Sequence, residues 1–336
     1  MLNVYRGKTL SFAFTPHGRF RSRLPADSGA RPLAGQLPEA DLAAIEEHTI
    51  GIAGHADALR GGDIAHRPAR VARRRRRRRD IRLCKLAGVS PDHPVYEDIG
   101  RSYSRTRRED PRVAADILSC LGLGRSVVNV GAGTGNYEPS DRLVVAVEPS
   151  PEMLRQRHGR TRRVVRGVAE GLPFPDGVFD VAMAVLTIHH WAEPAAGLHE
   201  LRRVARRQIV LFFEPLRTHD FWAFEYFPPA GVSSEQNAPG EDVIRQALRV
   251  REIRPVLVPH DCVDGFGAAF WSRPEAYLDP EIQAGISWLA LLPEHTRTRG
   301  SEQLAADLAS GAWERRHGHL RRLTTYDGGY RIAIAE

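Results

Sequence analysis

The feature that most constrains the fold is a short apolar stretch, Val127–Val130, that runs directly into glycines at positions 131, 133 and 135. Closely spaced valines predict a buried strand. The glycines predict a loop, because they adopt positive φ angles without steric strain and let the backbone approach a ligand closely. The stretch therefore predicts a strand that ends in a loop able to bind an adenosine-bearing molecule.

A second apolar run, Leu143–Val147, ends in Glu148, which lies 17 positions after Gly131. An acidic residue at the tip of the next parallel strand lies where a nucleoside ribose presents its two hydroxyls. We therefore predict that Glu148 binds ribose. The dinucleotide fingerprint G-x-G-x-x-G would place its third glycine at Asn136, whereas this chain has G-x-G-x-G, which disfavours a nicotinamide-dependent oxidoreductase.

Four motifs resemble, in order and spacing, those of the class I S-adenosylmethionine-dependent methyltransferases. They are most similar to those of the ubiquinone/menaquinone-biosynthesis enzymes and their small-molecule relatives. They read VNVGAGTG (128–135), VEPSPEM (147–153), AEGLPFPD (169–176) and FDVAMAVLTIHH (179–190). The resemblance implies a Rossmann-like α/β fold, with a seven-stranded, mostly parallel sheet and helices on both faces. It also implies S-adenosylmethionine as cofactor and methyl transfer to a small-molecule acceptor, leaving S-adenosylhomocysteine.

The resemblance further implies the cofactor site. In the family, a segment of the pattern Y-x-x-I-x-x-x-Y-x-x-x-R, here Tyr96 to Arg107, lies over the pocket; the alternative is an ordinary amphipathic helix with buried tyrosines. Tyr96 and Tyr103 would wall the sulfonium, and Arg107 would reach the methionine carboxylate. Where the family has Asp-Ala, this chain has Val168-Ala169, so adenine would be held by Ala169 backbone or by Glu170. The implied cofactor residues are Tyr96, Tyr103, Arg107, Asn129, Gly131, Ala132, Gly133, Gly135, Glu148, Pro149, Ala169, Glu170 and Leu186.

Two adjacent histidines, His189 and His190, follow the predicted fourth strand, at the end where open α/β sheets bind ligands. We expect them to point in different directions, which makes a metal site improbable, and no metal is predicted. One of them, His190 in the first place, would line the acceptor pocket and accept a proton; the alternative is a histidine merely hydrogen-bonded in the loop. Substrate contacts are predicted for His260, Asp261, Phe270 and Trp271, and the aromatic segment 221–227 could wall the acceptor pocket or pack in the core.

The chain divides into a low-order, Arg-rich extension, residues 1–92, and a methyltransferase domain, residues 93–336. The extension carries a net charge of +9, with the arginine run 73–79 near its end, and the remainder carries −2. The basic excess thus lies outside the predicted enzyme and gives no electrostatic argument for a polyanionic substrate there. We expect a disordered leader; the alternatives are a nucleic-acid or anionic-surface tail and an overcalled start.

Within the domain, we predict a cofactor half at about 93–215, a substrate or lid region at about 216–325 and a final strand at about 329–335. Asp110 and Pro111 predict the start of a helix over 111–121. A sixth strand is predicted at 255–259. Helices around 281–291 and 301–316 would form a helical insertion before the last strand, in a position typical of lids that carry specificity.

The three cysteines lie far apart without a C-x-x-C pair, which fits a reducing compartment. No apolar run reaches the 18 residues of a transmembrane helix, so we expect a cytoplasmic protein without membrane contact. Two alternatives to small-molecule methyl transfer remain: an RNA or DNA methyltransferase recruited by the arginine run, and a non-catalytic protein that binds S-adenosylmethionine. The sequence leaves the acceptor and the oligomeric state open.

Overall fold

The computed structural model describes residues 3–5, 105–157, 163–218, 220–229 and 238–336. Of the predicted leader it describes β1 (Asn3–Tyr5), which forms a short strand. The predicted disorder of residues 6–92 lies outside the described residues, as do Tyr96 and Tyr103. The fold that follows is that of the described part of the chain.

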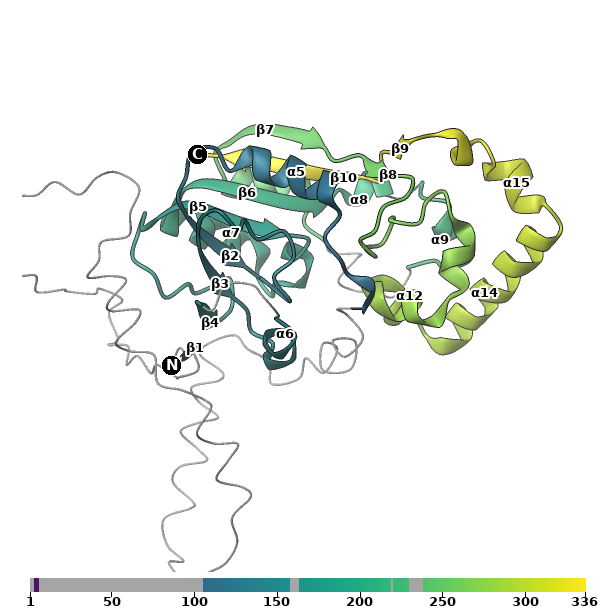
Figure 1. Cartoon of the computed structure of the whole chain (residues 1–336), viewed down its shortest axis with the longest axis horizontal. Coiled ribbons are helices and arrows are strands. Elements are labelled where there is room, and N and C mark those ends of the chain that lie inside the picture. Colours follow the sequence, from purple (N-terminus) through teal and green to yellow (C-terminus); the bar gives the residue numbers. More distant parts are fainter. Residues whose placement is uncertain (1–2, 6–104, 158–162, 219, 230–237) are drawn as a thin grey trace, which may run out of the picture.

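An eight-stranded sheet organises the molecule, in the order β1-β4-β3-β2-β5-β6-β10-β7 (Figure 1). Strands β4, β3, β2, β5 and β6 are parallel neighbours, and β10 pairs antiparallel with both β6 and β7. The predicted Rossmann-like fold with seven mostly parallel strands is confirmed; β1, which pairs antiparallel with β4 at the edge, was not predicted. The seven are β2 (Ser126–Val130), β3 (Leu143–Val147), β4 (Val164–Arg166), β5 (Phe179–Val185), β6 (Ala205–Phe213), β7 (Val250–Pro255) and β10 (Tyr330–Ala335).

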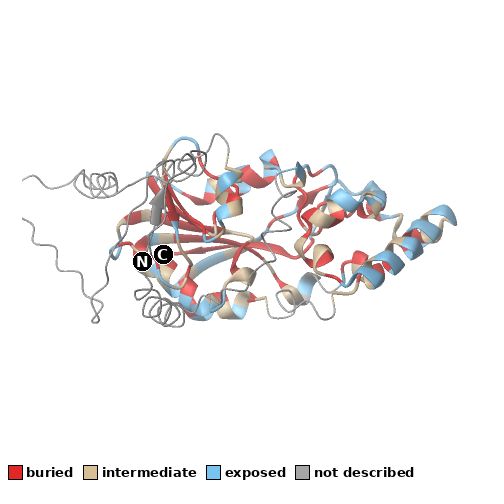
Figure 2. Ribbon diagram, turned by 90° about the horizontal axis from the view of Figure 1, so that it is seen from below, coloured by how far each residue is buried: buried red, intermediate tan, exposed pale blue. Residues whose placement is uncertain are grey.

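Helices cover both faces of the sheet, which is why the central strands are mostly apolar on both sides. Successive side chains of a strand point to opposite faces. Val127 accordingly belongs to the core that contains Ile117 of α5 (Pro111–Cys120), whereas Val128 belongs to the core that contains Leu198 of α7 (Pro194–Val204). Burial is concentrated in this sheet (Figure 2).

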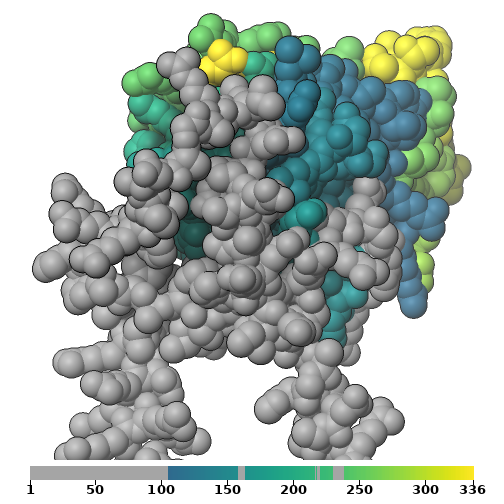
Figure 3. Space-filling model, turned by 60° about the vertical axis from the view of Figure 1, so that its left-hand side comes forward, coloured from purple at the N-terminus to yellow at the C-terminus, as the bar shows by residue number. Residues whose placement is uncertain are grey.

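Helix α5 begins as predicted. The Asp110 side chain accepts a hydrogen bond from the Arg112 amide at 3.0 Å, and Pro111 stands at the first helical position, where its missing N–H is not needed. The helix ends at Cys120, followed by Gly122 at φ 61°. Figure 3 presents the side on which this first described segment, in blue, lies beside the green and yellow C-terminal half.

The segment between β7 and β10 is mostly helical, which confirms the predicted insertion before the last strand (Figure 1). Its helices lie beyond the end of the sheet, and Figure 2 shows exposed residues along their outer sides. The elements are β8 (Val258–Pro259), η2 (Pro274–Leu278), α12 (Pro280–Gly285), α13 (Ser287–Ala290), α14 (Glu294–Ala309), α15 (Ala312–His317), η3 (Leu320–Arg322) and β9 (Thr325–Tyr326).

Several predicted boundaries were wrong. The sixth strand is β7, residues 250–255, and not 255–259, because Val258 and Pro259 pair with β9 in a separate two-stranded sheet. The predicted helix 281–291 is interrupted at Ile286, and the next one begins at Glu294 and breaks at Gly311, which has φ 71°. The fourth strand ends at Val185 rather than at 188, because residues 188–190 form a 3-10 turn, η1 (Ile188–His190).

The aromatic segment after β6 packs in the core. Its short helices are α8 (Pro215–Thr218) and α9 (Ala223–Tyr226), and α11 (Glu241–Ala247) follows. Trp222 is 3% exposed, and its ring meets those of Trp313 and Tyr277 edge to face at 5.3 and 5.4 Å. Of the two interpretations of this segment, its position favours core packing. No helix in the described ranges is long and apolar enough to span a membrane.

Candidate functional site

The glycine loop leaves the carboxyl end of β2 and lies against the carboxyl end of β3. Gly131, Gly133 and Gly135 have φ angles of 68°, 50° and 90°, the region that favours glycine. The Gly131 amide donates to the carbonyl oxygen of Val147 at 2.9 Å. A Cβ at Gly131 would lie 2.0 Å from Oγ1 of Thr187, so this position excludes any side chain. The loop is thus held against both β3 and the chain leaving β5.

Glu148, the predicted ribose ligand, lies at the tip of β3 and is 6% exposed. Its Oε2 accepts a hydrogen bond from the Gly133 amide at 2.8 Å, and its Oε1 accepts one from the Ser150 amide at 2.9 Å. A carboxylate offers about four lone pairs, so two acceptor positions remain for two hydroxyls. Burial raises the pKa of Glu148, opposed by these two amides and by the positive charge of Arg157.

A buried ion pair that sequence reasoning did not identify lies against the glycine loop. The Arg157 guanidinium donates to both carboxylate oxygens of Glu138 at 2.7 Å, and their side chains are 4% and 3% exposed. Arg157 also donates to the carbonyl oxygen of Gly133 at 3.1 Å. Asn129 donates to Glu138 at 3.0 Å, and its predicted contact with the cofactor stays a prediction. The pair therefore ties the loop to β2 and to the end of α6 (Pro151–Arg155).

A second cluster connects the loop to the segments before α5 and after β8. Arg107 Nε donates to Asp264 Oδ1 at 2.7 Å, and the Tyr137 hydroxyl donates to Oδ2 of the same carboxylate at 2.6 Å. Asp264 is fully buried, and Tyr137, at φ 66°, is 2% exposed. The segment predicted to cover the cofactor thus reaches the glycine loop. Binding of a cofactor carboxylate by Arg107, whose guanidinium already contacts Asp264, stays a prediction.

The two histidines lie together on η1, directly after Thr187, whose side chain lies against Gly131 of the loop. Their ring centroids are 3.8 Å apart, so the expectation that they point in different directions was wrong; the 3-10 turn brings adjacent rings to one side. The Nδ1 atom of His189 is buried without a hydrogen-bond partner. Burial, followed by the charges of His190 and Arg107, lowers the pKa of His189 well below its ordinary value. His189 is therefore neutral near pH 7, and its burial disfavours the protonated form.

The remaining predicted cofactor residues also lie at the carboxyl ends of the strands. Ala132 and Ala169 are buried, and the Glu170 carboxylate accepts the Glu193 amide at 3.1 Å, at the start of α7. Leu186 has φ 49°, a strained conformation for a branched side chain at the tip of β5. Pro149 is exposed. Their contacts with a cofactor stay predictions.

The four predicted substrate residues do not gather at the loop. His260 and Asp261 are exposed, and Asp261 pairs with Arg112 at 2.6 Å. Trp271 is fully buried, and its indole N–H donates to the Val258 carbonyl at 3.0 Å, which makes it a core residue. Phe270 packs against that core. Asp264 of this segment bonds Tyr137, two residues after the loop, and no local pattern distinguished it.

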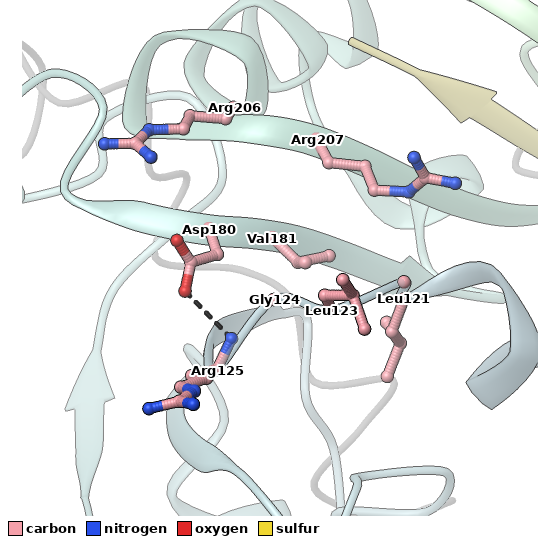
Figure 4. A pocket seen from close by; sticks show the side chains of 9 residues that line it. Leu121, Leu123, Gly124, Arg125, Asp180, Val181, Arg206 and Arg207 are labelled. Carbon is pink, nitrogen blue, oxygen red and sulfur yellow. Dashed lines mark hydrogen bonds between the residues drawn. The ribbon is translucent and has the colours of Figure 1, made fainter. Parts of the chain in front are cut away.

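A pocket of about 260 Å³ opens at the opposite ends of the parallel strands from the glycine loop (Figure 4). It lies at the amino ends of β2, β5 and β6, so it is not the site at the glycine loop. Its lining residues are Leu121, Gly122, Leu123, Gly124, Arg125, Asp180, Val181, Arg206 and Arg207. Within the described ranges, no group of three or more His, Cys, Asp or Glu side chains could hold a metal ion.

A glycine loop between parallel strands, with an acidic residue at the tip of the second, defines an α/β protein that binds an adenosine-bearing cofactor. Residues 128–213 match the profile of the methyltransferase domain family. A solved structure from Anabaena variabilis, assigned to the methyltransferases of an antibiotic biosynthesis pathway, is 34% identical. The alignment covers 69% of this chain and 99% of that one, with a TM-score of 0.64. This chain therefore belongs to the class I S-adenosylmethionine-dependent methyltransferases, and S-adenosylmethionine is its cofactor.

Two curated relatives match over shorter regions. A ubiquinone/menaquinone biosynthesis C-methyltransferase of Burkholderia mallei is 29% identical over 40% of this chain and 64% of its own length. A tRNA (carboxymethyluridine(34)-5-O)-methyltransferase of Xenopus tropicalis is 32% identical over 34% of this chain and 19% of its own length. In both, the matched region is less than two thirds of the relative, so neither fixes the acceptor.

Proposed function

We propose that this methyltransferase acts on a small-molecule acceptor, and that Glu148 and the glycine loop hold the cofactor ribose. The observation that carries the site is the Glu148 carboxylate, which is buried and engaged by two backbone amides yet keeps two acceptor positions. The near-complete coverage of the Anabaena variabilis relative, whose name refers to antibiotic biosynthesis, supports a small-molecule acceptor. The net negative charge of residues 93–336 supports it as well.

The transfer itself asks little chemistry of the protein. The methyl–sulfur bond breaks as the acceptor's lone pair bonds to the methyl carbon, and S-adenosylhomocysteine leaves. Because the sulfonium is already activated, the protein mainly supplies alignment and exclusion of water. An acceptor hydroxyl or acidic C–H must also lose a proton. We assign that proton to the η1 histidines, and to His190 in the first place, because burial disfavours a positive charge on His189 and the partly exposed His190 lies beside it.

Calorimetric titration tests the site. The whole chain should bind S-adenosylmethionine and S-adenosylhomocysteine with micromolar affinity and should not bind NADH. Glu148→Ala should weaken both interactions at least about 100-fold, because two hydrogen bonds to a charged acceptor contribute about 1.5 kcal/mol or more each. Leu123→Ala, at the opposite edge of the sheet, is the matched control and should bind like wild type. Wild-type affinity in Glu148→Ala would remove this residue from the site.

A nucleic-acid acceptor is the second candidate, favoured by the arginine run at 73–79 and by the similarity to a tRNA methyltransferase. Clustered arginines release counterions from phosphates, so such binding falls steeply with salt. We expect weak, salt-sensitive binding of RNA and no methyl transfer to it, measured with labelled cofactor. We also propose that the protein acts in the cytoplasm, which the scattered cysteines support.

A further inference from the structure

We infer that Arg157, held by Glu138 and Asn129, is a positioning residue that orients the glycine loop and keeps Glu148 ready to accept the ribose hydroxyls. The inference rests on the proposed ribose site. Arg157 does not contact Glu148 through any hydrogen bond that we observe. It acts on Glu148 through the peptide between Ala132 and Gly133 and through its charge.

That peptide connects the two side chains mechanically. Its carbonyl oxygen, on Ala132, accepts from Arg157 Nη1 at 3.4 Å, and its N–H, on Gly133, donates to Glu148 Oε2 at 2.8 Å. In a planar trans peptide the C=O and N–H bonds point in opposite directions. Fixing the carbonyl towards Arg157 therefore aims the amide at Glu148. The next carbonyl, on Gly133, accepts from the same guanidinium nitrogen at 3.1 Å, so two successive peptide planes are fixed.

The guanidinium in turn has little freedom. Both carboxylate oxygens of Glu138 accept from Arg157 Nη2 at 2.7 Å. Asn129 of β2 donates to Oε1 of Glu138 at 3.0 Å. All three side chains are buried. A buried ion pair contributes little net stability compared with apolar residues of similar volume, so the pair beside the loop is better suited to positioning than to stabilising the fold.

The charge of Arg157 also acts on Glu148. Burial raises the pKa of Glu148, and Arg157 is the charged side chain that opposes this effect, together with the amides of Gly133 and Ser150. Glu138 is the other charge in direct contact with Arg157. A protonated Glu148 would offer one acceptor fewer and turn a donor towards the ribose hydroxyls. Arg157 thus helps to keep Glu148 in the acceptor form that the ribose requires.

The test is the affinity of the whole chain for S-adenosylhomocysteine, measured by calorimetry from pH 5 to pH 8. The double variant Glu138→Gln with Arg157→Met removes the pair without leaving a buried charge alone. We expect at least tenfold weaker binding at pH 7.5, and a fall in affinity on acidification that begins at higher pH than in wild type. Arg157→Lys retains the charge but lacks the two guanidinium nitrogens that bond Gly133 and Glu138 together. It should therefore bind more weakly with the wild-type pH profile.

Arg155→Met is the matched control, because Arg155 lies on α6 two residues away with its side chain 73% exposed, and it should match wild type. Wild-type affinity at every pH in either the double variant or Arg157→Lys would overturn the inference. Weaker binding by the double variant with an unshifted pH profile would overturn it too, since a merely structural role predicts that result. If wild type fails to bind, or Glu148→Gln binds like wild type, the ribose site itself is wrong and the inference falls with it.

Discussion

Two carboxylates at opposite ends of the parallel strands accept similar hydrogen bonds, yet their pKa values are shifted in opposite directions. Asp180, at the amino end of β5, accepts from the amides of Arg125 and Ser126 at 2.9 and 3.0 Å and from the Ser126 hydroxyl at 3.0 Å. Burial would raise the pKa of Asp180, but these donors and the charge of Arg206 lower it overall. Glu148, at the carboxyl end of β3, also accepts two amides, yet its pKa is raised by burial.

We interpret the difference as that between a carboxylate that stabilises the fold and one that we propose binds a ligand. Three donors of the chain converge on Oδ2 of Asp180, so the folded state favours its ionised form. Glu148 is more deeply buried and under-partnered, a state that destabilises the ionised form until a ligand donates to it. A raised carboxylate pKa at a strand tip is therefore consistent with a binding role.

The glycine loop should be the least tolerant part of the ligand end. Gly131→Ala combines positive φ with a Cβ 2.0 Å from Thr187 Oγ1, so we expect a loss of about 2–5 kcal/mol of unfolding free energy and loss of cofactor binding. Gly133→Ala has nothing within 4 Å of its Cβ and should lose only about 1–2 kcal/mol. Urea denaturation compares the two; equal losses would show that backbone strain alone matters.

At the other end of the sheet, Asp180→Asn should weaken the fold and spare the ligand. The variant keeps the shape but not the charge, so we expect about 1–3 kcal/mol less stability at pH 7 with unchanged cofactor affinity. Because the folded pKa of Asp180 is lowered, its contribution is present above the unfolded value near 3.8 and is lost as the pH falls through the folded pKa. Denaturation at pH 7 and at a series of values below pH 3.8 measures the decline, and a difference that does not shrink as the pH falls would contradict it.

The pH dependence of cofactor binding sharpens the contrast. The pKa of Glu148 lies above the ordinary 4.5, so the carboxylate should protonate at a higher pH than an ordinary glutamate, and affinity should fall as the pH drops through that value. Below it, the loss approaches about tenfold, or 1.4 kcal/mol, per pH unit. Calorimetry on wild type and Asp180→Asn should give the same curve, because Asp180 is not at the site. A curve that Asp180→Asn displaces would break the division into two classes.

Asp264 is a third carboxylate, and Tyr137→Phe assigns it to one class or the other. Removing the hydroxyl deletes one of its hydrogen bonds and leaves the contact with Arg107. We expect about 0.5–1.5 kcal/mol lower stability and less than about threefold change in cofactor affinity, as for a carboxylate that serves the fold. Thermal unfolding and calorimetry measure both. A larger loss of affinity than of stability would move Asp264 to the ligand class.

The sequence predicted what local patterns encode. Valine-rich strands, the glycine spacing and the acidic residue at position 148 are contiguous signals, and they located the sheet and one end of the site. The Asp264 contacts with Arg107 and Tyr137 join residues 157 and 127 positions apart, and such pairs leave no periodicity in the chain. The Glu138–Arg157 pair is closer in sequence, but either residue alone resembles an ordinary surface charge.

Two other misses have local causes. Strand β7 lies at the sheet edge and reads Val-Arg-Glu-Ile-Arg-Pro, so its polar residues do not form the apolar run expected of a strand. The apolar residues 256–258 do form such a run, and the strand was therefore predicted too late in the sequence. The relation between His189 and His190 depended on whether residue 188 continues the strand. In a strand adjacent side chains diverge, whereas the 3-10 turn brings the two rings together.

The position of β10 has a consequence for biosynthesis. These residues, 330–335, lie between β6 and β7, although both neighbours are translated earlier. Until they leave the ribosome, β6 and β7 have no partner on their facing sides, and each presents an open edge on which another nascent chain could pair. The cofactor-binding strands can assemble before that point, but the sheet closes only once residues 330–335 have emerged. A delay between β7 and β10 should therefore favour aggregation of the chain.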